Sequence, residues 1–293
     1  MNCRQLLQVL VLGASVSAPG LALAADSEMA AELGAGGASR ADLGSLAAIA
    51  TAPGILHLRP RFDLGGGFAY GTGNARKWQV AATDSQTGPV ALGVMFSRTS
   101  EESEVRDEDL PGWKEEDLVI GERREIRQRV GGAIATSFLN RTIGVGASLA
   151  YLYRKDGFDR TDGAIGVGAS AGLRAGEQFV LSVTGDNLLP TGLWFAPTTF
   201  ATGARLDVSP AAALQGDLIL DFTSLANEVA IDARVGAEFT VGGIVPLRVG
   251  WARFGALDEN RLTAGIGVGN EQAAVDYAFQ GTLATDGQPF EQW

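Results

Sequence analysis

Three groups of residues in this sequence have the types and spacing that chemistry requires. His57 is the only histidine among 293 residues, and a histidine beside a serine or a carboxylate is the usual general base of a hydrolase. Residues 166–171, Gly-Val-Gly-Ala-Ser-Ala, have the G-x-G-x-x-A spacing of a dinucleotide fingerprint. Residues 101–125 hold eleven acids and four bases, and such oxygen-rich sets can bind Ca²⁺ or Mg²⁺.

None of these groups has the context that its chemistry needs. The fingerprint requires a strand, a turn and a helix, whereas residues 166–171 lie inside an alternating run, and Gly-x-Gly recurs at 144–146 and 265–267. The acidic segment lacks EF-hand spacing, so a solvated loop that makes weak divalent-cation contacts is the simpler interpretation. We therefore expect no catalytic residue, no metal site and no cofactor. His57 is left as the one residue on which a barrel hydrolase would depend.

The elements that position these residues are strands. From residue 55 onward, stretches of about ten residues alternate apolar with small or polar side chains, the period-two pattern of β-structure. In one of them Ile143, Val145, Ala147 and Leu149 oppose glycine and serine. The expected strands lie at 55–71, 77–83, 89–99, 123–138, 141–154, 162–174, 178–187, 199–208, 213–222, 228–240, 244–253, 261–269, 272–280 and, in part, 287–293.

The connections between these strands alternate in length. Those after even-numbered strands are tight, such as 139–140 and 270–271, whereas those after odd-numbered strands are mostly longer, such as 100–122 and 187–198. Short turns at one end and long loops at the other are typical of outer-membrane barrels. We therefore predict an all-β fold, a transmembrane antiparallel β-barrel of about fourteen strands spanning residues 55–293, in the outer membrane of a Gram-negative cell.

The two faces of the predicted strands differ in the way a lipid-facing wall and a polar lumen differ. A slip of one residue would turn Arg234 toward lipid, and a basic residue at the midplane costs roughly 2–4 kcal/mol. His57 is expected near the periplasmic rim, beside the first charges of the lumen-facing set. That set is Arg59, Arg61, Asp63, Arg127, Arg129, Arg205, Asp207, Asp217, Asp221, Asp232, Arg234, Glu238, Arg248 and Asp276.

The first residues read as a secretory signal. Arg4 precedes an apolar stretch at 6–12, and Ala22-Leu23-Ala24 forms an A-x-A cleavage site. We predict a signal peptide at residues 1–24. Its removal leaves 22 basic and 34 acidic residues, a net charge of −12, which argues against a nucleic-acid partner.

Residues 25–54 separate the predicted signal from the first strand. They are rich in alanine and glycine with weak helical periodicity, and a barrel of fourteen strands would leave a hole that needs a plug. We expect this segment to enter the lumen as a hatch, where small residues on the wall would leave space for it. The alternative is a flexible periplasmic tail.

Three stretches resemble the FadL-type outer-membrane transporters of hydrophobic compounds and the related PorV-like barrels. Residues 33–41 with 52–56 look like the glycine-rich hatch of that family, through Gly34, Gly36, Gly37, Pro53 and Gly54; Ala52 stands where the family has asparagine. Residues 183–189 and 274–279 look like two of its strands. The resemblance implies a hatch-plugged barrel through which apolar molecules diffuse passively from an outer groove. The last predicted strand, about seven residues long, is shorter than the 9–11 residues that normally span the membrane.

Two loops hold the candidate ligand groove, because each carries apolar side chains that could fold over the barrel mouth. The candidates are Trp113, Leu118, Ile120, Leu188, Leu193, Trp194 and Phe195. The alternative is that Trp113 and Trp194 only anchor the barrel in an aromatic belt. The expected partners are outer-membrane lipid, lipopolysaccharide and a hydrophobic small molecule. The alternative function is a PorV-like barrel whose loops dock an envelope or secretion complex.

Overall fold

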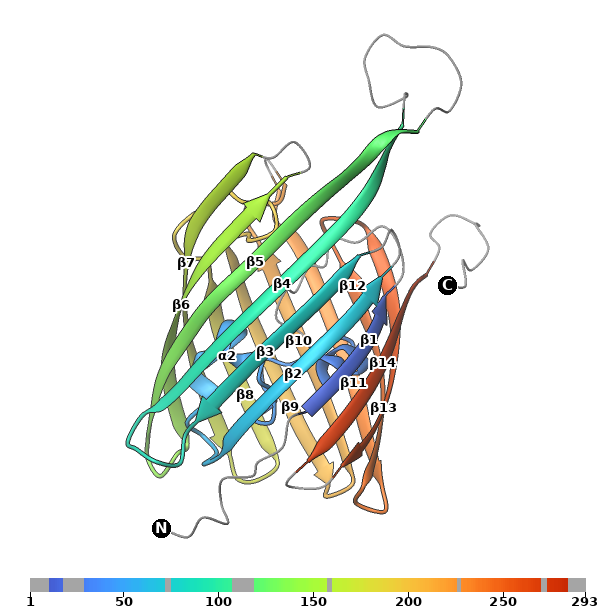
Figure 1. Ribbon diagram of the computed structural model, residues 1–293. Helices are drawn as coiled ribbons and strands as arrows, with labels where there is room; N and C mark the ends of the chain where they lie inside the picture. Colours follow the sequence, from blue (N-terminus) through green and yellow to red (C-terminus); the bar gives the residue numbers. More distant parts are fainter. Residues whose placement is uncertain are drawn as a thin grey trace.

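The computed structural model describes residues 11–17, 29–71, 75–106, 119–156, 160–225, 228–269 and 273–283. Within these ranges the protein is all-β, with one sheet of thirteen antiparallel strands and two short helices. Figure 1 shows the strands inclined around a common axis. They are β2 (Phe62–Gly71), β3 (Arg76–Asp84), β4 (Ala91–Arg106), β5 (Val119–Phe138), β6 (Ile143–Lys155), β7 (Thr161–Ala175), β8 (Phe179–Asp186), β9 (Thr199–Ser209), β10 (Ala212–Asp221), β11 (Ala230–Val241), β12 (Val245–Phe254), β13 (Glu259–Gly269) and β14 (Ala274–Leu283).

The two ends of this sheet are joined by β1 (Val11–Ser17), which comes from the predicted signal peptide. β1 pairs in parallel with β2, where Leu12 lies opposite Gly66, and with β14, where Ser15 lies opposite Ala278. With β1 in place the strand order closes into a barrel. Thirteen of the fourteen predicted strands are thus present, and the expected strand at 287–293 lies outside the described residues.

The connections confirm the alternation in length in part, because three of the six at one end are longer than every turn at the other. At one end the six turns from β3–β4 to β13–β14 have two to six residues each. At the other end β4–β5 and β8–β9 are joined by twelve residues each, and β10–β11 by eight. The β2–β3 and β12–β13 connections at that end are short, with four residues each. We call the ends the short-turn end and the long-loop end.

The strands present an apolar face outward and a small or polar face inward. On β4 the outward Leu92 and Val94 are 56% and 61% exposed, whereas the inward Ala91 and Ser97 are buried. The same alternation holds on β6, where Leu149 faces outward and Ser148 inward. The predicted register is therefore confirmed. No helix within the described residues is long and apolar enough to cross a membrane.

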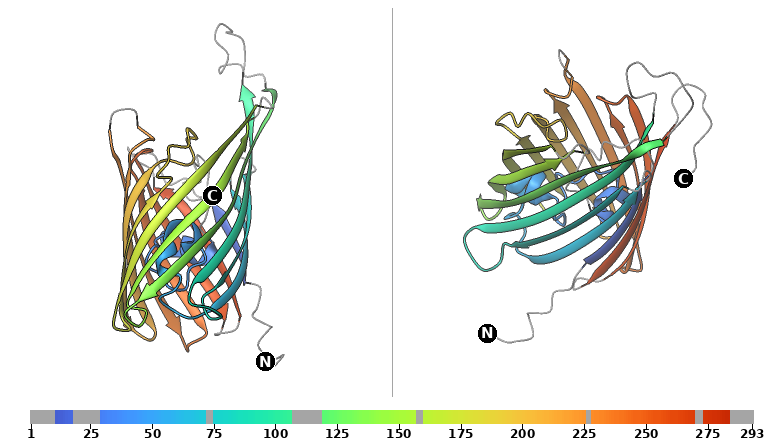
Figure 2. Two further views of the ribbon diagram at one scale, coloured as in Figure 1. Left: turned by 90° about the vertical axis from the view of Figure 1, so that its left-hand side faces the viewer. Right: turned by 45° about the horizontal axis from the view of Figure 1, so that its top comes forward.

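A hatch formed by residues 29–61 lies inside the barrel (Figure 2). It contains α1 (Ala30–Gly34), α2 (Ala48–Thr51) and a 3₁₀ turn, η2 (Pro53–Ile55). Its apolar side chains form a buried cluster with wall residues; the cluster includes Met29, Leu46, Ile49, Ile55, Leu56, Leu58, Ala81, Met95 and Ala133.

The predicted boundary between hatch and barrel is wrong by several residues. The first strand was expected at 55–71 but begins at Phe62. Ile55 and Leu56 are both buried although they are adjacent, which a helical turn allows and a half-buried strand does not. Pro53 starts this turn, where a missing N–H costs nothing, and Pro60 has no N–H with which to join a β-ladder.

Candidate functional site

Lumen-facing glycines hold the hatch against the wall. Around η2, a Cβ added to Gly144 would overlap the carbonyl oxygen of Gly54, and one on Gly146 would lie 2.7 Å from the Gly54 nitrogen. The Gly54 N–H also donates to Ser170 Oγ at 2.6 Å. The backbone of the hatch thus occupies the volume that larger wall side chains would fill, as the glycine content predicts.

A second cradle holds the turn after α1. A Cβ on Gly250 would overlap the Gly36 nitrogen, and one on Gly236 would overlap the Ala35 carbonyl oxygen. Gly36 itself has φ +74°, which favours glycine. Thr263 Oγ1 accepts from Gly36 N–H at 2.9 Å and donates to the Gly34 carbonyl oxygen at 3.1 Å. Gly34, Gly36 and Gly54 therefore lie at contacts between the hatch and the wall.

The hatch separates two cavities of the lumen. The outer cavity, about 350 Å³, opens toward the long-loop end and is floored by Ser39, Arg40, Ala50 and Thr51 of the hatch. The inner cavity, about 460 Å³, lies toward the short-turn end and is lined by other hatch residues, including Glu32 and Asp42.

The outer cavity combines apolar and charged walls. Its apolar lining includes Leu152, Trp194, Phe195, Ile219, Phe254 and Leu257, and its charged lining includes Arg40, Arg129, Asp186, Asp221, Asp232 and Arg234. Phe254 stacks under two guanidinium groups, with Arg261 at 4.2 Å and Arg234 at 5.3 Å from the ring centroid. Such a site suits a molecule with an apolar body and a polar group.

The loop between β8 and β9 forms one side of this cavity. Leu193 is buried against Ala150 and Leu152 of β6. Trp194 lies edge-on to Phe195 with ring centroids 6.0 Å apart, and the Arg127 guanidinium lies 5.0 Å from the Trp194 ring centroid. Trp194 thus lines the cavity rather than standing in an outer belt.

The predicted groove residues divide into three sets. Trp194 and Phe195 line the cavity, Leu193 supports it from behind, and Leu188 lies over Gly185 at the rim. Ile120 belongs to β5, but its side chain is not described. Trp113 and Leu118 lie outside the described residues, as does much of the acidic segment.

Arg40 ties the outer face of the hatch to the wall. Its Nη2 lies 2.8 Å from Asp186 Oδ2 and its Nη1 3.7 Å from Asp217 Oδ2. The Ser39 N–H donates to the same Asp217 oxygen at 3.0 Å. The carboxyl group of Asp217 is 1% exposed. On the next strand, Arg234 Nη1 donates to the Gly37 carbonyl oxygen at 3.2 Å.

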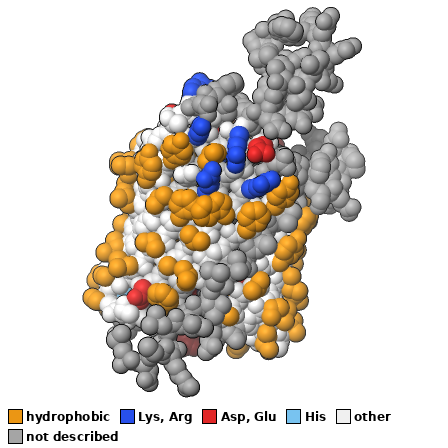
Figure 3. Space-filling model, in the orientation of Figure 1, with side chains coloured by type: hydrophobic (Ala, Val, Ile, Leu, Met, Phe, Trp, Pro, Cys, Tyr) orange, Lys and Arg blue, Asp and Glu red, His pale blue; other side chains and the backbone are white. Residues whose placement is uncertain are grey.

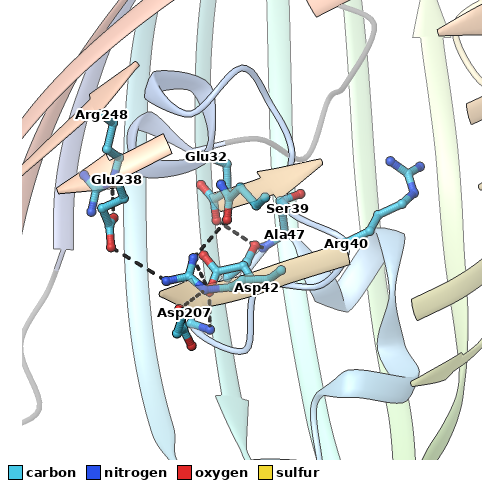
Figure 4. Close-up of polar contacts among 12 residues, drawn as sticks. Glu32, Ser39, Arg40, Asp42, Ala47, Asp207, Glu238 and Arg248 are labelled. Atoms are coloured by element: carbon cyan, nitrogen blue, oxygen red, sulfur yellow. Dashed lines mark hydrogen bonds and ion pairs between the residues drawn. The ribbon is translucent and has the colours of Figure 1, made fainter. Parts of the chain in front are cut away.

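Asp42 ties the inner face of the hatch to the wall through a cluster of ion pairs. Arg205 lies 3.5 Å from Asp42, 2.9 Å from Asp207 and 3.7 Å from Glu238. Arg248 then connects Glu238, at 2.6 Å, to Asp276. Figure 4 shows this group gathered beside the hatch, with the Arg40 side chain pointing away from it. The two attachments therefore lie on opposite faces of the hatch.

Two hatch carboxyl groups respond differently to burial. Burial raises the pKa of Glu32, although Ser45 Oγ donates to it at 2.7 Å. Burial acts in the same direction on Asp42, but Arg205, the Gly44 N–H, Arg61 and Arg248 together lower the pKa of Asp42 below its usual value. Asp42 is therefore held as the anion that the Arg205 cluster needs.

The lumen charges are mostly placed as predicted. Those on β5 and β9–β14 face inward, among them Arg127, Arg129, Asp217, Asp221, Asp232, Arg234, Glu238, Arg248 and Asp276. Arg59 and Arg61 are exceptions, because both precede β2. Arg59 is exposed and lines the inner cavity, whereas Arg61 pairs with Asp63 at 2.9 Å and donates to the Ser45 carbonyl oxygen.

His57 is also misplaced by the sequence prediction, because it belongs to the hatch and not to a strand. Its Nδ1 lies 2.8 Å from Ser137 Oγ, the distance of a nucleophile–base pair. Its Nε2 is buried without a close hydrogen-bond partner among the described residues, although the Gly88 backbone is near enough to raise the pKa of the ring. The pair joins the hatch to the wall.

This contact makes hatch docking depend on pH. Burial, and next the charge of Arg141, lower the pKa of His57 below its usual 6.5. In a released hatch, His57 would take up a proton near its usual pKa of 6.5. The hatch therefore docks most strongly above this pH, and docking weakens as the pH falls toward the lower pKa that His57 has in the docked state. We expect docking of the wild type to weaken between pH 7.5 and 5.5 more than docking of His57→Gln.

The measurement uses maleimide labelling of Ala47→Cys in a Cys3→Ser background, which we call the hatch reporter; Ala47 is 0% exposed. The labelling rates of the wild type and His57→Gln are compared at the same pH, which cancels the reagent's own pH dependence. It also cancels the effect of Glu32, whose raised pKa changes docking with pH in the opposite direction. The same ratio of the two rates at pH 7.5 and at pH 5.5 would contradict a role for His57 in docking.

No group of three or more His, Cys, Asp or Glu side chains in the described ranges is arranged to hold a metal ion. Residues 166–171 lie within β7, which runs on as a strand to Ala175. No protein-family model matches the chain, and no curated protein is significantly similar to it. The resemblance to FadL-type and PorV-like barrels therefore stays a prediction.

Proposed function

We propose that this chain is an outer-membrane β-barrel that lets small hydrophobic compounds such as long-chain fatty acids pass without covalent chemistry. It would be exported by a signal peptide whose cleavage removes β1, so that β2 and β14 would then be the two edges that must meet to close the barrel. The observation that carries the proposal is the divided lumen. A cavity with apolar and charged walls faces the long-loop end, and a hatch separates it from a second cavity at the short-turn end.

The outer surface supports a membrane location. Large apolar side chains are exposed on strands all around the sheet, for example Trp78, Leu149, Phe200, Val249 and Val275. Soluble monomers rarely expose contiguous apolar patches larger than a few hundred Å². Inside the barrel, charged side chains pair with one another and with the hatch backbone. These pairings supply the hydrogen bonds and opposite charges that lipid could not supply.

The lining of the outer cavity supports the type of solute. Trp194, Phe254 and Ile219 offer apolar contact, while Arg129 and Arg234 lie on the same lining. An amphipathic molecule could bury its apolar body against the first set and direct a carboxylate toward the second. Because the hatch lies across the lumen, onward passage requires it to move. The contacts of Arg40 and Asp42 are the ones that must loosen.

Binding to the outer cavity tests this proposal. Burying an aromatic side chain against a ligand contributes about 1.5–3 kcal/mol, so we expect Trp194→Ala to weaken binding of a fluorescent long-chain fatty acid at least tenfold. Trp78→Ala is the matched control, because Trp78 faces outward from β3. Unchanged affinity in Trp194→Ala, or an equal loss in both variants, would place the ligand elsewhere.

A further inference from the structure

We propose that four basic side chains on the outer wall of β3–β6 bind the phosphate groups of lipid A, the phosphorylated glycolipid of the outer leaflet. Arg76, Arg98, Arg124 and Lys155 form this cationic wall patch. The inference rests on the membrane-spanning orientation proposed above, but it does not depend on the passage of a solute.

The register of the sheet brings the four side chains together. Arg76 on β3 lies opposite Ser100 on β4, and Ser100 lies opposite Ile126 on β5, which in turn lies opposite Lys155 on β6. These four positions form one row across four strands. All of them carry outward side chains, since they continue the outward alternation of Trp78, Val94, Val130 and Tyr151.

The other two cations flank this row. Arg98 lies two residues before Ser100 on the same face of β4, opposite Trp78. Arg124 lies two residues before Ile126 on β5, opposite Glu102, and its Nε donates to Ser100 Oγ at 3.0 Å. Residues opposite or diagonal to each other in a sheet lie within reach of long side chains, so one phosphorylated head group can contact several of these cations.

Among the side chains that the structure describes, the patch brings four cations together on one outward face of the wall. Glu102 lies 3.7 Å from Arg124, and the next positions on the same two strands that share this face are Glu104 and Glu122, opposite each other. Elsewhere at the long-loop end, Arg253 of β12 also faces outward, and it pairs with Asp258 at 3.0 Å. The chain as a whole carries −11, so a local cluster of four cations runs against its overall charge.

Aromatic residues place the patch at the level of lipid head groups. Tyr70 lies opposite Arg76, Trp78 opposite Arg98, and Tyr153 follows Tyr151 on the outward face of β6. Tyrosine and tryptophan gather where the apolar band of a membrane protein meets the polar interface. Figure 3 shows Lys and Arg side chains gathered above a band of hydrophobic side chains on this face.

The position of the patch along the barrel indicates which leaflet it contacts. The patch lies toward the long-loop end, and long loops face the cell exterior in outer-membrane barrels. The occupant at that level is the lipid A head group, whose phosphates accept charge-assisted hydrogen bonds from arginine and lysine. Lipid A also has acyl chains that can lie against Trp78, Phe96 and Val130 below the patch.

The test measures binding of lipid A to the purified full chain in detergent, by native mass spectrometry in the presence of EDTA. The patch variant combines Arg76→Gln and Arg98→Gln. The control combines Arg160→Gln and Arg253→Gln, which removes the same charge from exposed arginines at the same end. We expect at least tenfold weaker binding of bisphosphorylated lipid A to the patch variant and little change in the control.

Three outcomes would overturn the inference. The first is equal binding of lipid A to the patch variant and the wild type, and the second is equal binding of dephosphorylated and bisphosphorylated lipid A to the wild type. The third is an equal loss of binding in the patch variant and the control, which would show that net charge alone acts. Heat-dependent migration on gels, measured on each protein, reports separately whether a stable barrel forms. A barrel that inserts into membranes but fails the lipid A test removes only this inference, whereas a chain that never inserts removes the proposed function as well.

Discussion

Replacing Gly144 and Gly146 by valine is expected to expel the hatch from the lumen while leaving the wall intact. At Gly144 an added Cβ overlaps the Gly54 carbonyl oxygen, and at Gly146 it lies 2.7 Å from the Pro53 carbonyl carbon. These neighbours are backbone atoms, so no rotamer change can relieve the overlap. Valine itself suits a strand, and β6 would keep its pairing with β5 and β7.

The hatch reporter measures this release directly. Ala47→Cys should be protected from maleimide in the parent and labelled at least tenfold faster in the double valine variant, with conductance across a planar bilayer rising in parallel. Gly281→Val is the control, because a Cβ at Gly281 would lie 3.5 Å from the Phe279 ring, which is ordinary van der Waals contact. Continued protection in the double variant would show that the cradle does not hold the hatch.

Arg40→Met is expected to have the largest effect of any single substitution in the hatch. The change removes the ion-pair partner that the hatch gives to Asp217, whose side chain is 1% exposed, and leaves Arg234, opposite Asp217 on β11, as the nearby wall cation. Removing one member of a buried ion pair costs about 3–5 kcal/mol, since the remaining charge stays buried. The cost falls on hatch docking, because Asp186 and Asp217 lie on the wall and Arg40 on the hatch.

The rescue variant separates lost pairing from lost packing. Asp217→Asn combined with Arg40→Met removes the stranded charge, and an asparagine can still accept from the Ser39 N–H. We expect fast labelling of the hatch reporter in Arg40→Met and a slower rate in the double variant. The same rate in both would assign the effect to the arginine stem and not to the ion pair.

Much of the wall could be predicted because each strand carries its own signal. Alternation between outward Leu149 or Tyr151 and inward Ser148 or Ala150 follows from the period of a strand alone. The start of β2 could not be placed in this way, because the apolar residues 55, 56 and 58 resemble the beginning of a strand until their contacts with the rest of the hatch are known.

The contacts that make the site are harder to predict than the strands. Glycine on the inner face indicates that something approaches the wall, but which glycine meets Gly54 depends on how the hatch lies. The sequence does not mark Arg40 as an anchor, because Arg40 is 146 residues from Asp186 and 177 from Asp217. It does not mark Phe254 either, because the place of Phe254 in the outer cavity depends on barrel closure. Arg40 and Asp42 are charged residues within a run rich in glycine and alanine, and this is the one sequence signal that could have indicated these two residues as attachments of the hatch.

The two attachments give the hatch its dividing role. Arg40 binds wall carboxylates beside the outer cavity, and Asp42 binds the Arg205 cluster beside the inner cavity. Residues two apart in the chain thus fix opposite faces of one plug. A solute in the outer cavity would lie against Arg40 and Asp186, so its binding can affect the first attachment without contacting the second.

Uptake by cells is the most direct test of the central claim, that this barrel lets hydrophobic molecules cross the outer membrane. The measurement compares radiolabelled long-chain fatty acids and aromatic hydrocarbons in cells that lack the protein and in the same cells carrying the wild type or Trp194→Ala. We predict that the wild type restores uptake of at least one of these compounds and that Trp194→Ala restores it several-fold less. Uptake of every compound at the same rate with and without a folded wild-type barrel would contradict the account.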